Sequence, residues 1–402
     1  MADPECLAGG RAGVTVTASA GHVDRLLERR STANERFFTE EAERIARLCR
    51  VMAERFVRDG RLLAVASSPQ GRSDAHHVAV EFVHPVIVGK RALPALAIAP
   101  ESGGTAAVLD LLAEQDDMVI AFDGDRAAVA LTRERGCLTI AFASAGAEWE
   151  FEAPGDDPFV RQELAETLYH LVWELVHVFF DHLGGSTRGA GASSFLYPFL
   201  EGGGGDLEAV VDDVCRSVLM KASEIGELRA RTLEDGRETL GAAAAELRRA
   251  FDLGGKLLAF GNGGSATDAM DVVADFRGAP QGWAPRRALD LTEDPAILTA
   301  LANDIGPEVL FQRQIIAYGR PGDVAVALST SGNSADIVEA LAEARRRGLS
   351  TIAFVGYDGG RIAAEALADH VVVTYSEHIP RIQEAQASAY HVLRELVELG
   401  SS

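Results

Sequence analysis

The amino-acid sequence predicts an α/β protein in which two similar, doubly wound parallel sheets follow one another along the chain. Short apolar runs such as Leu257–Phe260, Val324–Leu328 and Thr351–Val355 have the length and composition of buried parallel strands. Amphipathic segments such as Ala335–Arg347 lie between such runs and are predicted to be helices. Alternation of strands and helices is typical of a parallel sheet covered on both faces, which binds its ligands at the carboxyl ends of the strands.

The second observation behind this prediction is an internal repeat. Matched segments occur in the same order in both halves of the chain: Arg61–Val65 with Lys256–Phe260, Thr139–Phe142 with Thr351–Phe354, and Gln162-Glu163 with Gln383-Glu384. A histidine follows each glutamine at the same spacing, His170 in the first half and His391 in the second. Because the offset between the matched positions increases along the chain, we interpret the first half as a shortened copy of the second.

The expected domains are residues 1–200 and 207–402, joined by the glycine-rich run 201–206. A run of this composition is typical of a flexible linker. A glycine-rich ligand loop is the alternative interpretation, although no predicted strand closely precedes the run.

Composition restricts the class of protein further. The chain has 402 residues, of which 47% are apolar and 24% charged, which suits two globular domains. The formal net charge of −22 argues against a role on nucleic acid or on an anionic membrane. The four cysteines form no CxxC pair, which favours reduced thiols. Residues 1–14 do not resemble a signal peptide and the apolar stretch Leu171–Phe180 is too short to span a bilayer, so we expect a cytoplasmic protein.

Two loops in the second half have the composition of a phosphate-binding site. Gly261–Ser265 and Ser329–Ser334 each follow a predicted strand and precede a predicted helix. Glycine lets the backbone approach an anion closely, the helix N-terminus supplies free N–H groups, and the hydroxyls add hydrogen bonds. Helix caps use the same residue types, so one such loop would be weak evidence. Two in one domain predict a phosphate site that needs no cationic side chain.

These loops, together with Asp268, Ala302–Asp304 and Arg381–Glu384, resemble the sedoheptulose 7-phosphate isomerase (phosphoheptose isomerase) family. The resemblance covers nearly all of residues 207–402 and is fainter over 30–182. It implies a Rossmann-like sugar-isomerase (SIS) domain in each half, helical contacts within a homo-oligomer, and interconversion of sedoheptulose 7-phosphate with a heptose 7-phosphate. It further implies zinc in many members, no nucleotide cofactor, and a substrate-binding set made of Asn262, Gly263, Ser265, Asp304, Ser329, Thr330, Ser331, Ser334 and Gln383.

Proton-transfer residues are the second requirement of an aldose–ketose isomerase. The reaction needs a base and an acid around an enediol, for which a carboxylate and a histidine are suited, and a metal can polarise the carbonyl. In the family, a histidine and a glutamate one helical turn apart follow the first glycine loop, and a glutamine and a histidine lie on the last helix. The first half matches all four positions, with His77, Glu81, Gln162 and His170. The resemblance implies that these four residues are metal ligands and that Glu81 and His170 are also catalytic.

The second half departs from this pattern, because Asp271 and Asp275 stand at the histidine and glutamate positions. Asp275 and His391 are its candidate catalytic residues. The first half in turn lacks the phosphate loops: Ser67–Gly71 replaces the first, and only Phe122–Gly124 remains of the second, where Asp123 is expected to repel phosphate. One hypothesis is therefore a composite site, with phosphate held by the second half and proton transfer served by the first. The alternatives are a second half that acts alone and a first half that is a structural relic.

The sequence thus predicts a phosphoheptose isomerase-like enzyme. Two alternatives stay open. One is an isomerase of octulose phosphate or of another long-chain sugar phosphate in a secondary pathway, because the departures at Asp271, Asp275 and Pro380 leave the substrate undetermined. The other is a non-catalytic sugar-phosphate sensor or adaptor, which would keep the phosphate loops and lose the acid and base.

Overall fold

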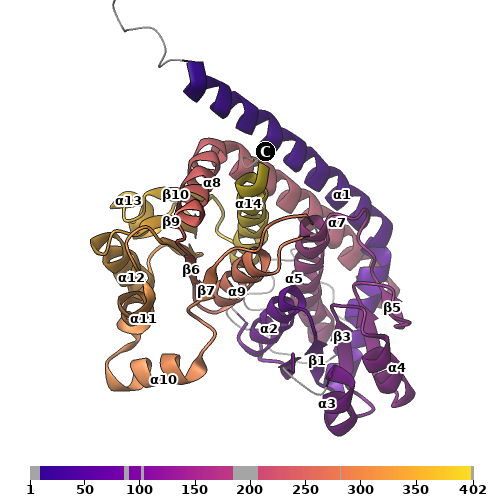
Figure 1. The fold of residues 1–402 in the computed structure, drawn as a ribbon. Helices are drawn as coiled ribbons and strands as arrows, with labels where there is room; N and C mark the ends of the chain where they lie inside the picture. The colour runs from indigo at the N-terminus through magenta and orange to yellow at the C-terminus, as the bar shows by residue number, and fades with distance from the viewer. Residues whose placement is uncertain (1–9, 86–89, 101–103, 184–206, 281, 400–402) are drawn as a thin grey trace, which may run out of the picture. The chain divides into compact units, whose positions relative to one another are not determined.

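The structure is a computed structural model that describes residues 10–85, 90–100, 104–183, 207–280 and 282–399 (Figure 1). The chain divides into two compact units: a first unit, Ala33–Ile225, and a second unit, Met1–Thr32 with Gly226–Ser402. The dividing points fall within two long helices, α1 (Gly10–Val57) and α7 (Leu207–Asp235). The expected linker 201–206 lies outside the described residues, and the expected domain boundaries stay a prediction.

The first unit contains a parallel sheet of five strands in the order β2-β1-β3-β4-β5. Its strands are β1 (Leu62–Val65), β2 (Ala95–Ile98), β3 (Met118–Ala121), β4 (Leu138–Ala141) and β5 (Trp149–Glu150). The helices that follow these strands or close the unit are α2 (Pro69–Val83), α3 (Thr105–Leu112), α4 (Arg126–Glu134) and α5 (Pro158–Leu183).

The second unit contains a parallel sheet in the order β10-β9-β8-β6-β7. Its strands are β6 (Leu257–Phe260), β7 (Ala288–Asp290), β8 (Val324–Ser329), β9 (Ser350–Gly356) and β10 (His370–Thr374). Its further helices are α8 (Arg237–Asp252), α9 (Gly264–Arg277), α10 (Pro295–Asp304), the 3-10 turn η1 (Pro307–Val309), α11 (Leu310–Tyr318), α12 (Ala335–Arg346), α13 (Gly360–Ala364) and α14 (Ile379–Leu399).

The two sheets have the same topology. When the strands of each unit are counted from its own first strand, both orders are 2-1-3-4-5. The expected α/β class with two parallel sheets in tandem is therefore confirmed. In this topology the chain reverses its direction of winding between the first and third strands, and ligands bind in the crevice outside that point.

The strands are buried on both faces, as their continuous apolar runs predict. Successive residues of a strand point to opposite faces of a sheet. Leu257 and Ala259 of β6 accordingly pack in one apolar cluster, while Leu258 and Phe260 pack in another on the opposite face. In β1 the same alternation separates Leu62 and Ala64 from Leu63 and Val65.

A buried carboxylate joins the amino ends of the first and third strands in both units. Asp117, at the start of β3, accepts hydrogen bonds from the backbone N–H of Arg61 (2.9 Å) and from the Arg61 guanidinium (2.6 Å). Burial alone would raise the pKa of Asp117, but hydrogen bonds from Arg61 and from backbone N–H groups outweigh burial and hold the pKa below its usual value. In the second unit Asp323 accepts from the backbone N–H of Lys256 (3.0 Å) and pairs with the Lys256 ammonium. The repeat thus extends to polar contacts.

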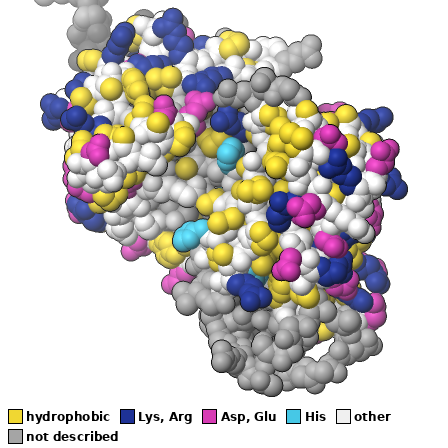
Figure 2. Space-filling view, turned by 90° about the horizontal axis from the view of Figure 1, so that it is seen from below, with side chains coloured by type: hydrophobic (Ala, Val, Ile, Leu, Met, Phe, Trp, Pro, Cys, Tyr) yellow, Lys and Arg dark blue, Asp and Glu magenta, His cyan; other side chains and the backbone are white. Residues whose placement is uncertain are grey.

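Three further features concern the surface charge, the hydropathy of the helices and the thiols. Acidic and basic side chains are mixed over the face drawn in Figure 2, which displays no patch of one sign. Among the residues that the structure describes, each helix is either too short or too polar to cross a bilayer. Cys49, Cys137 and Cys215 are free thiols.

Candidate active site

The two predicted phosphate loops leave neighbouring strands of the second unit. β6 and β8 are paired in parallel, with Phe260 opposite Ala327, so the loops Gly261–Ser265 and Ser329–Ser334 emerge side by side. The first loop leads into α9 and the second into α12. The N-cap residues Gly263 and Ser334 make no side-chain capping hydrogen bond. Helix N–H groups without a capping side chain, at the point where the sheet reverses its winding, form a suitable site for an anion.

Glycine is required in the second loop. Gly332 has a φ of 62°, and a Cβ atom there would lie 2.2 Å from the carbonyl oxygen of Gly359. The N–H of Gly332 donates to the hydroxyl oxygen of Ser329 (3.1 Å), and the N–H of Asn333 donates to that of Ser331 (3.2 Å). These hydrogen bonds fold the loop back on its own serine hydroxyl groups and fix the positions of those hydroxyl groups.

A cavity of about 590 Å³ opens beside this loop. Its size suits a small phosphorylated metabolite. The residues that line it come from the loop itself and from the chain after β9 and β10: Ser331, Asn333, Tyr357, Asp358, Tyr375, Ser376 and Glu377. Tyr357 has a φ of 52°, a strained value for a residue with a large side chain. Ser331 and Asn333 belong to the predicted phosphate loop, whereas no local motif in the sequence marks the other five residues.

The other expected substrate residues lie in varied environments. Ser265 and Gln383 are buried, in α9 and α14. Asn262 is exposed and donates to a carboxylate oxygen of Asp336 (2.8 Å). Asp304 is exposed at the end of α10, and its carboxylate accepts from the amide of Asn303 (2.7 Å). Their roles in binding, like that of Thr330, stay predictions.

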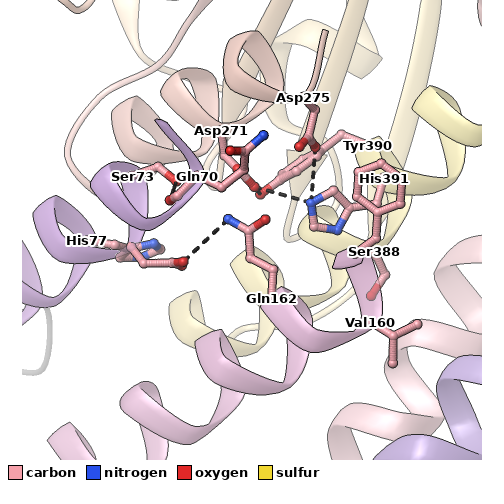
Figure 3. Close-up of polar contacts among 12 residues, drawn as sticks. Gln70, Ser73, His77, Val160, Gln162, Asp271, Asp275, Ser388, Tyr390 and His391 are labelled. Carbon is pink, nitrogen blue, oxygen red and sulfur yellow. Dashed lines mark hydrogen bonds and ion pairs between the residues drawn. The ribbon is translucent and has the colours of Figure 1, made fainter. Parts of the chain in front are cut away.

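The first unit brings three of its four predicted metal ligands together. His77 and Glu81 lie one turn apart on α2, with 4.0 Å between His77 Nε2 and Glu81 Oε1. His170 on α5 lies with its Nε2 atom 3.2 Å from His77 Nε2. All three side chains are at most 3% exposed. The fourth predicted ligand, Gln162, directs its amide nitrogen to Asp74 Oδ2 at 3.5 Å (Figure 3).

This cluster fits a zinc ion by its spacing and by its donor atoms. Ligands about 2.0–2.1 Å from a tetrahedral zinc lie roughly 3.3 Å from each other, and imidazole and carboxylate are common zinc ligands. The two histidine nitrogens already stand at that separation, and the carboxylate lies somewhat farther away. The Tyr169 hydroxyl contacts Nδ1 of His77 at 3.0 Å. Such a contact orients the ring and leaves Nε2 as the coordinating atom.

The second unit builds a similar cluster from different residues. Asp271 and Asp275 lie one turn apart on α9, and His391 lies on α14. Nε2 of His391 is 3.2 Å from Asp271 Oδ2 and 3.3 Å from Asp275 Oδ2, and all three residues are buried (Figure 3). Tyr390 donates its hydroxyl to Asp271 (2.9 Å). The imidazole of His391 thus lies between two carboxylates.

Both clusters contain a tyrosine that the sequence analysis missed. Tyr169 precedes His170, and Tyr390 precedes His391. Each tyrosine contacts the first residue of the pair on the helix opposite, His77 or Asp271. The repeated Tyr-His dipeptide was the signal that could have identified them.

Comparisons with known proteins agree with this architecture. A SIS domain model matches residues 222–356. A phosphoheptose isomerase of Chlorobium phaeobacteroides is 41% identical over 196 residues, which are 48% of this chain and 82% of the relative. One from a Roseiflexus species is 38% identical over 198 residues, 46% of this chain and 94% of the relative. Among solved structures, the C-terminal domain of glucosamine-fructose-6-phosphate aminotransferase from Francisella tularensis has a TM-score of 0.61 at 11% identity, covering 94% of this chain and 95% of that one. This last likeness shows the fold alone.

Proposed function

The chain belongs to the phosphoheptose isomerase family of SIS-domain proteins, and we propose that it is an aldose–ketose isomerase that interconverts sedoheptulose 7-phosphate and a heptose 7-phosphate. One observation carries the proposal. Two serine- and glycine-rich loops without capping side chains stand at the reversal point of the second sheet, in a chain that also contains buried pairs of carboxylate and histidine.

Phosphate binding is assigned to the second unit. The N–H groups at the starts of α9 and α12 and the hydroxyls of Ser329, Ser331 and Ser334 can donate hydrogen bonds to a phosphate. The adjoining cavity contains tyrosine, serine and carboxylate groups, which are suitable partners for the hydroxyl groups of a sugar chain.

Proton transfer then moves the carbonyl group. A base removes a proton from C1 of the open-chain ketose, and the electron pair of that C–H bond forms a double bond between C1 and C2. The C2 oxygen receives a proton, which gives a 1,2-enediol. Return of a proton to C2 and loss of the proton on the C1 oxygen produce the aldose. A carboxylate base and a histidine acid can perform both halves of this sequence.

Two residue pairs are candidates for these steps: Glu81 with His170 in the first unit, and Asp275 with His391 in the second. We favour the first pair because it matches the family pattern in residue type. Asp275 is shorter by one methylene, and its partner His391 also contacts Asp271. His77, Glu81 and His170 would hold a zinc ion, which would polarise the substrate carbonyl. A ligand atom cannot bind the metal and transfer a proton at once, so for His170 Nε2 metal binding and acid catalysis are alternative roles, and with zinc bound Glu81 could act as base only through its second carboxylate oxygen. Gln162 is a proposed fourth ligand.

The test is turnover of sedoheptulose 7-phosphate, followed by NMR of the sugar signals, with binding measured separately by calorimetry. We expect turnover by the wild-type chain and a lower rate with a ketose phosphate one carbon longer. A higher rate with the longer sugar would favour the octulose phosphate alternative. Binding of phosphosugars without turnover of either would identify a sensor and refute the isomerase proposal.

A further inference from the structure

The first unit has its own pair of loops at the reversal point of its sheet. β1 and β3 are paired in parallel with Val65 opposite Ala121, as β6 and β8 are in the second unit. The loop after β1 contains Ser67 and Ser68 and leads into α2, while the loop after β3 contains Asp123. These loops correspond in topology to the two phosphate loops of the second unit.

In the first unit the Asp123 carboxylate binds the loop after β1. One of its oxygens accepts hydrogen bonds from the backbone N–H of Ser67, from that of Ser68 (2.8 Å) and from the Ser67 hydroxyl (3.2 Å). The other oxygen accepts from the Ser68 hydroxyl (2.5 Å). A negative group therefore already occupies the start of α2, and it uses backbone N–H groups and serine hydroxyls as its donors.

The backbone of α2 is shaped to admit this carboxylate. A Cβ atom on Gly71 would lie 2.5 Å from Asp123 Oδ1, so any larger residue there would force the carboxylate away. The Ser68 hydroxyl also accepts from the N–H of Gly71 (2.9 Å), which connects the helix cap to the bound carboxylate.

We propose that Asp123 is a built-in anion that occupies the phosphate position of the first unit, so that this unit carries a latent anion site which its own side chain keeps closed. The comparison with the second unit rests on the phosphate role proposed above for its loops. A phosphate that approached the first unit would have to displace a carboxylate tethered within the same unit, whose effective concentration is high, and would be repelled by its charge. The sequence predicts only that Asp123 repels phosphate. The hydrogen bonds of the structure add that its carboxylate takes up the donors at the start of α2.

The test is hydrogen–deuterium exchange of the segment 66–72 in the full-length chain, with and without inorganic phosphate. In the wild type we expect slow exchange that phosphate does not change. In Asp123→Ala we expect exchange at least about tenfold faster, because charge-assisted hydrogen bonds are lost, and a return of protection as phosphate is added.

Two further variants control for charge and for loop disruption. Asp156→Asn removes one exposed negative charge from the same unit and should behave as the wild type. Gly71→Ala should displace the carboxylate but keep its charge, and so speed exchange with little recovery on phosphate. Unchanged exchange in Asp123→Ala, or fast exchange that phosphate leaves unaffected, would overturn the proposal. Because the readout lies in the first unit, it does not depend on whether the second unit binds phosphate.

Discussion

Replacing Glu81 by glutamine is the most informative single change in this protein. The substitution keeps the shape of a side chain that is 3% exposed, so it creates no cavity, but it removes the negative charge 4.0 Å from His77. If Glu81 is the base, loss of general base catalysis should lower kcat about a hundredfold to ten-thousandfold, equivalent to roughly 3–5 kcal/mol of activation free energy. Because His170 next to it is fully buried, bulk water has little access to replace the base, and we expect the upper part of that range.

The matched control is Asp275→Asn, which makes the same chemical change at the corresponding position of the second unit. We expect it to retain kcat within about tenfold of the wild type. The assay follows the conversion of sedoheptulose 7-phosphate by NMR in D2O, where exchange of the C1 proton reports the first step alone. Thermal unfolding and phosphosugar binding show whether each variant is intact. The opposite pattern, with Asp275→Asn inactive and Glu81→Gln active, would refute the assignment and give the chemistry to the second unit.

Three further predictions concern metal, substrate binding and stability. His170→Ala should lose zinc that the wild-type chain retains after dialysis, whereas His391→Ala should keep it, as measured by elemental analysis. Gly332→Ala should raise KM at least about tenfold, because its Cβ would overlap a backbone carbonyl. The control is Gly322→Ala, which is also at positive φ but has open space around it; it should cost only about 1 kcal/mol of stability and leave KM unchanged. The lowered pKa of Asp117 means that its carboxylate stabilises the fold above the pKa of about 4 in the unfolded chain, and that this contribution is lost as the pH falls through the folded-state value. In urea unfolding, Asp117→Asn should therefore cost about 2 kcal/mol at neutral pH and progressively less in acid.

Local patterns in the sequence were sufficient to predict the strands and the approach of His77 to Glu81. A continuous apolar run such as Leu257–Phe260 has few alternatives to a buried strand, and two residues four apart on a helix share a face. The approach of His170 to that pair was implied only by the family resemblance, since the spacing of Gln162 and His170 also allowed the two to face different sites.

Contacts between residues that are far apart in sequence and meet only at the edge of the folded sheet could not be predicted from local patterns. Tyr357 and Glu377 line the cavity beside Ser331 because parallel strands end at the same edge, yet they are far from Ser331 in sequence. The division of α1 and α7 between units also has no local signal, since each helix has one continuous helical pattern. For Asp123 the sequence predicted the sign of the effect but not the hydrogen bonds that the carboxylate makes.

The two buried clusters differ in the donor atoms and the charges that they bring together. In the first unit two imidazoles and one carboxylate converge, a set that is neutral or negative unless a histidine is protonated, and that offers nitrogen lone pairs to a cation. In the second unit the two carboxylates can be compensated by a protonated His391 and by the buried guanidinium of Arg394, which donates to the carbonyl oxygen of Asp275 (3.1 Å). Buried charges are tolerated when they are paired in this way, and the same three residues also lie close enough together to hold a metal ion. Retention of zinc by His391→Ala together with its loss from His170→Ala would therefore assign the metal to the first cluster and leave charge pairing as the role of the second.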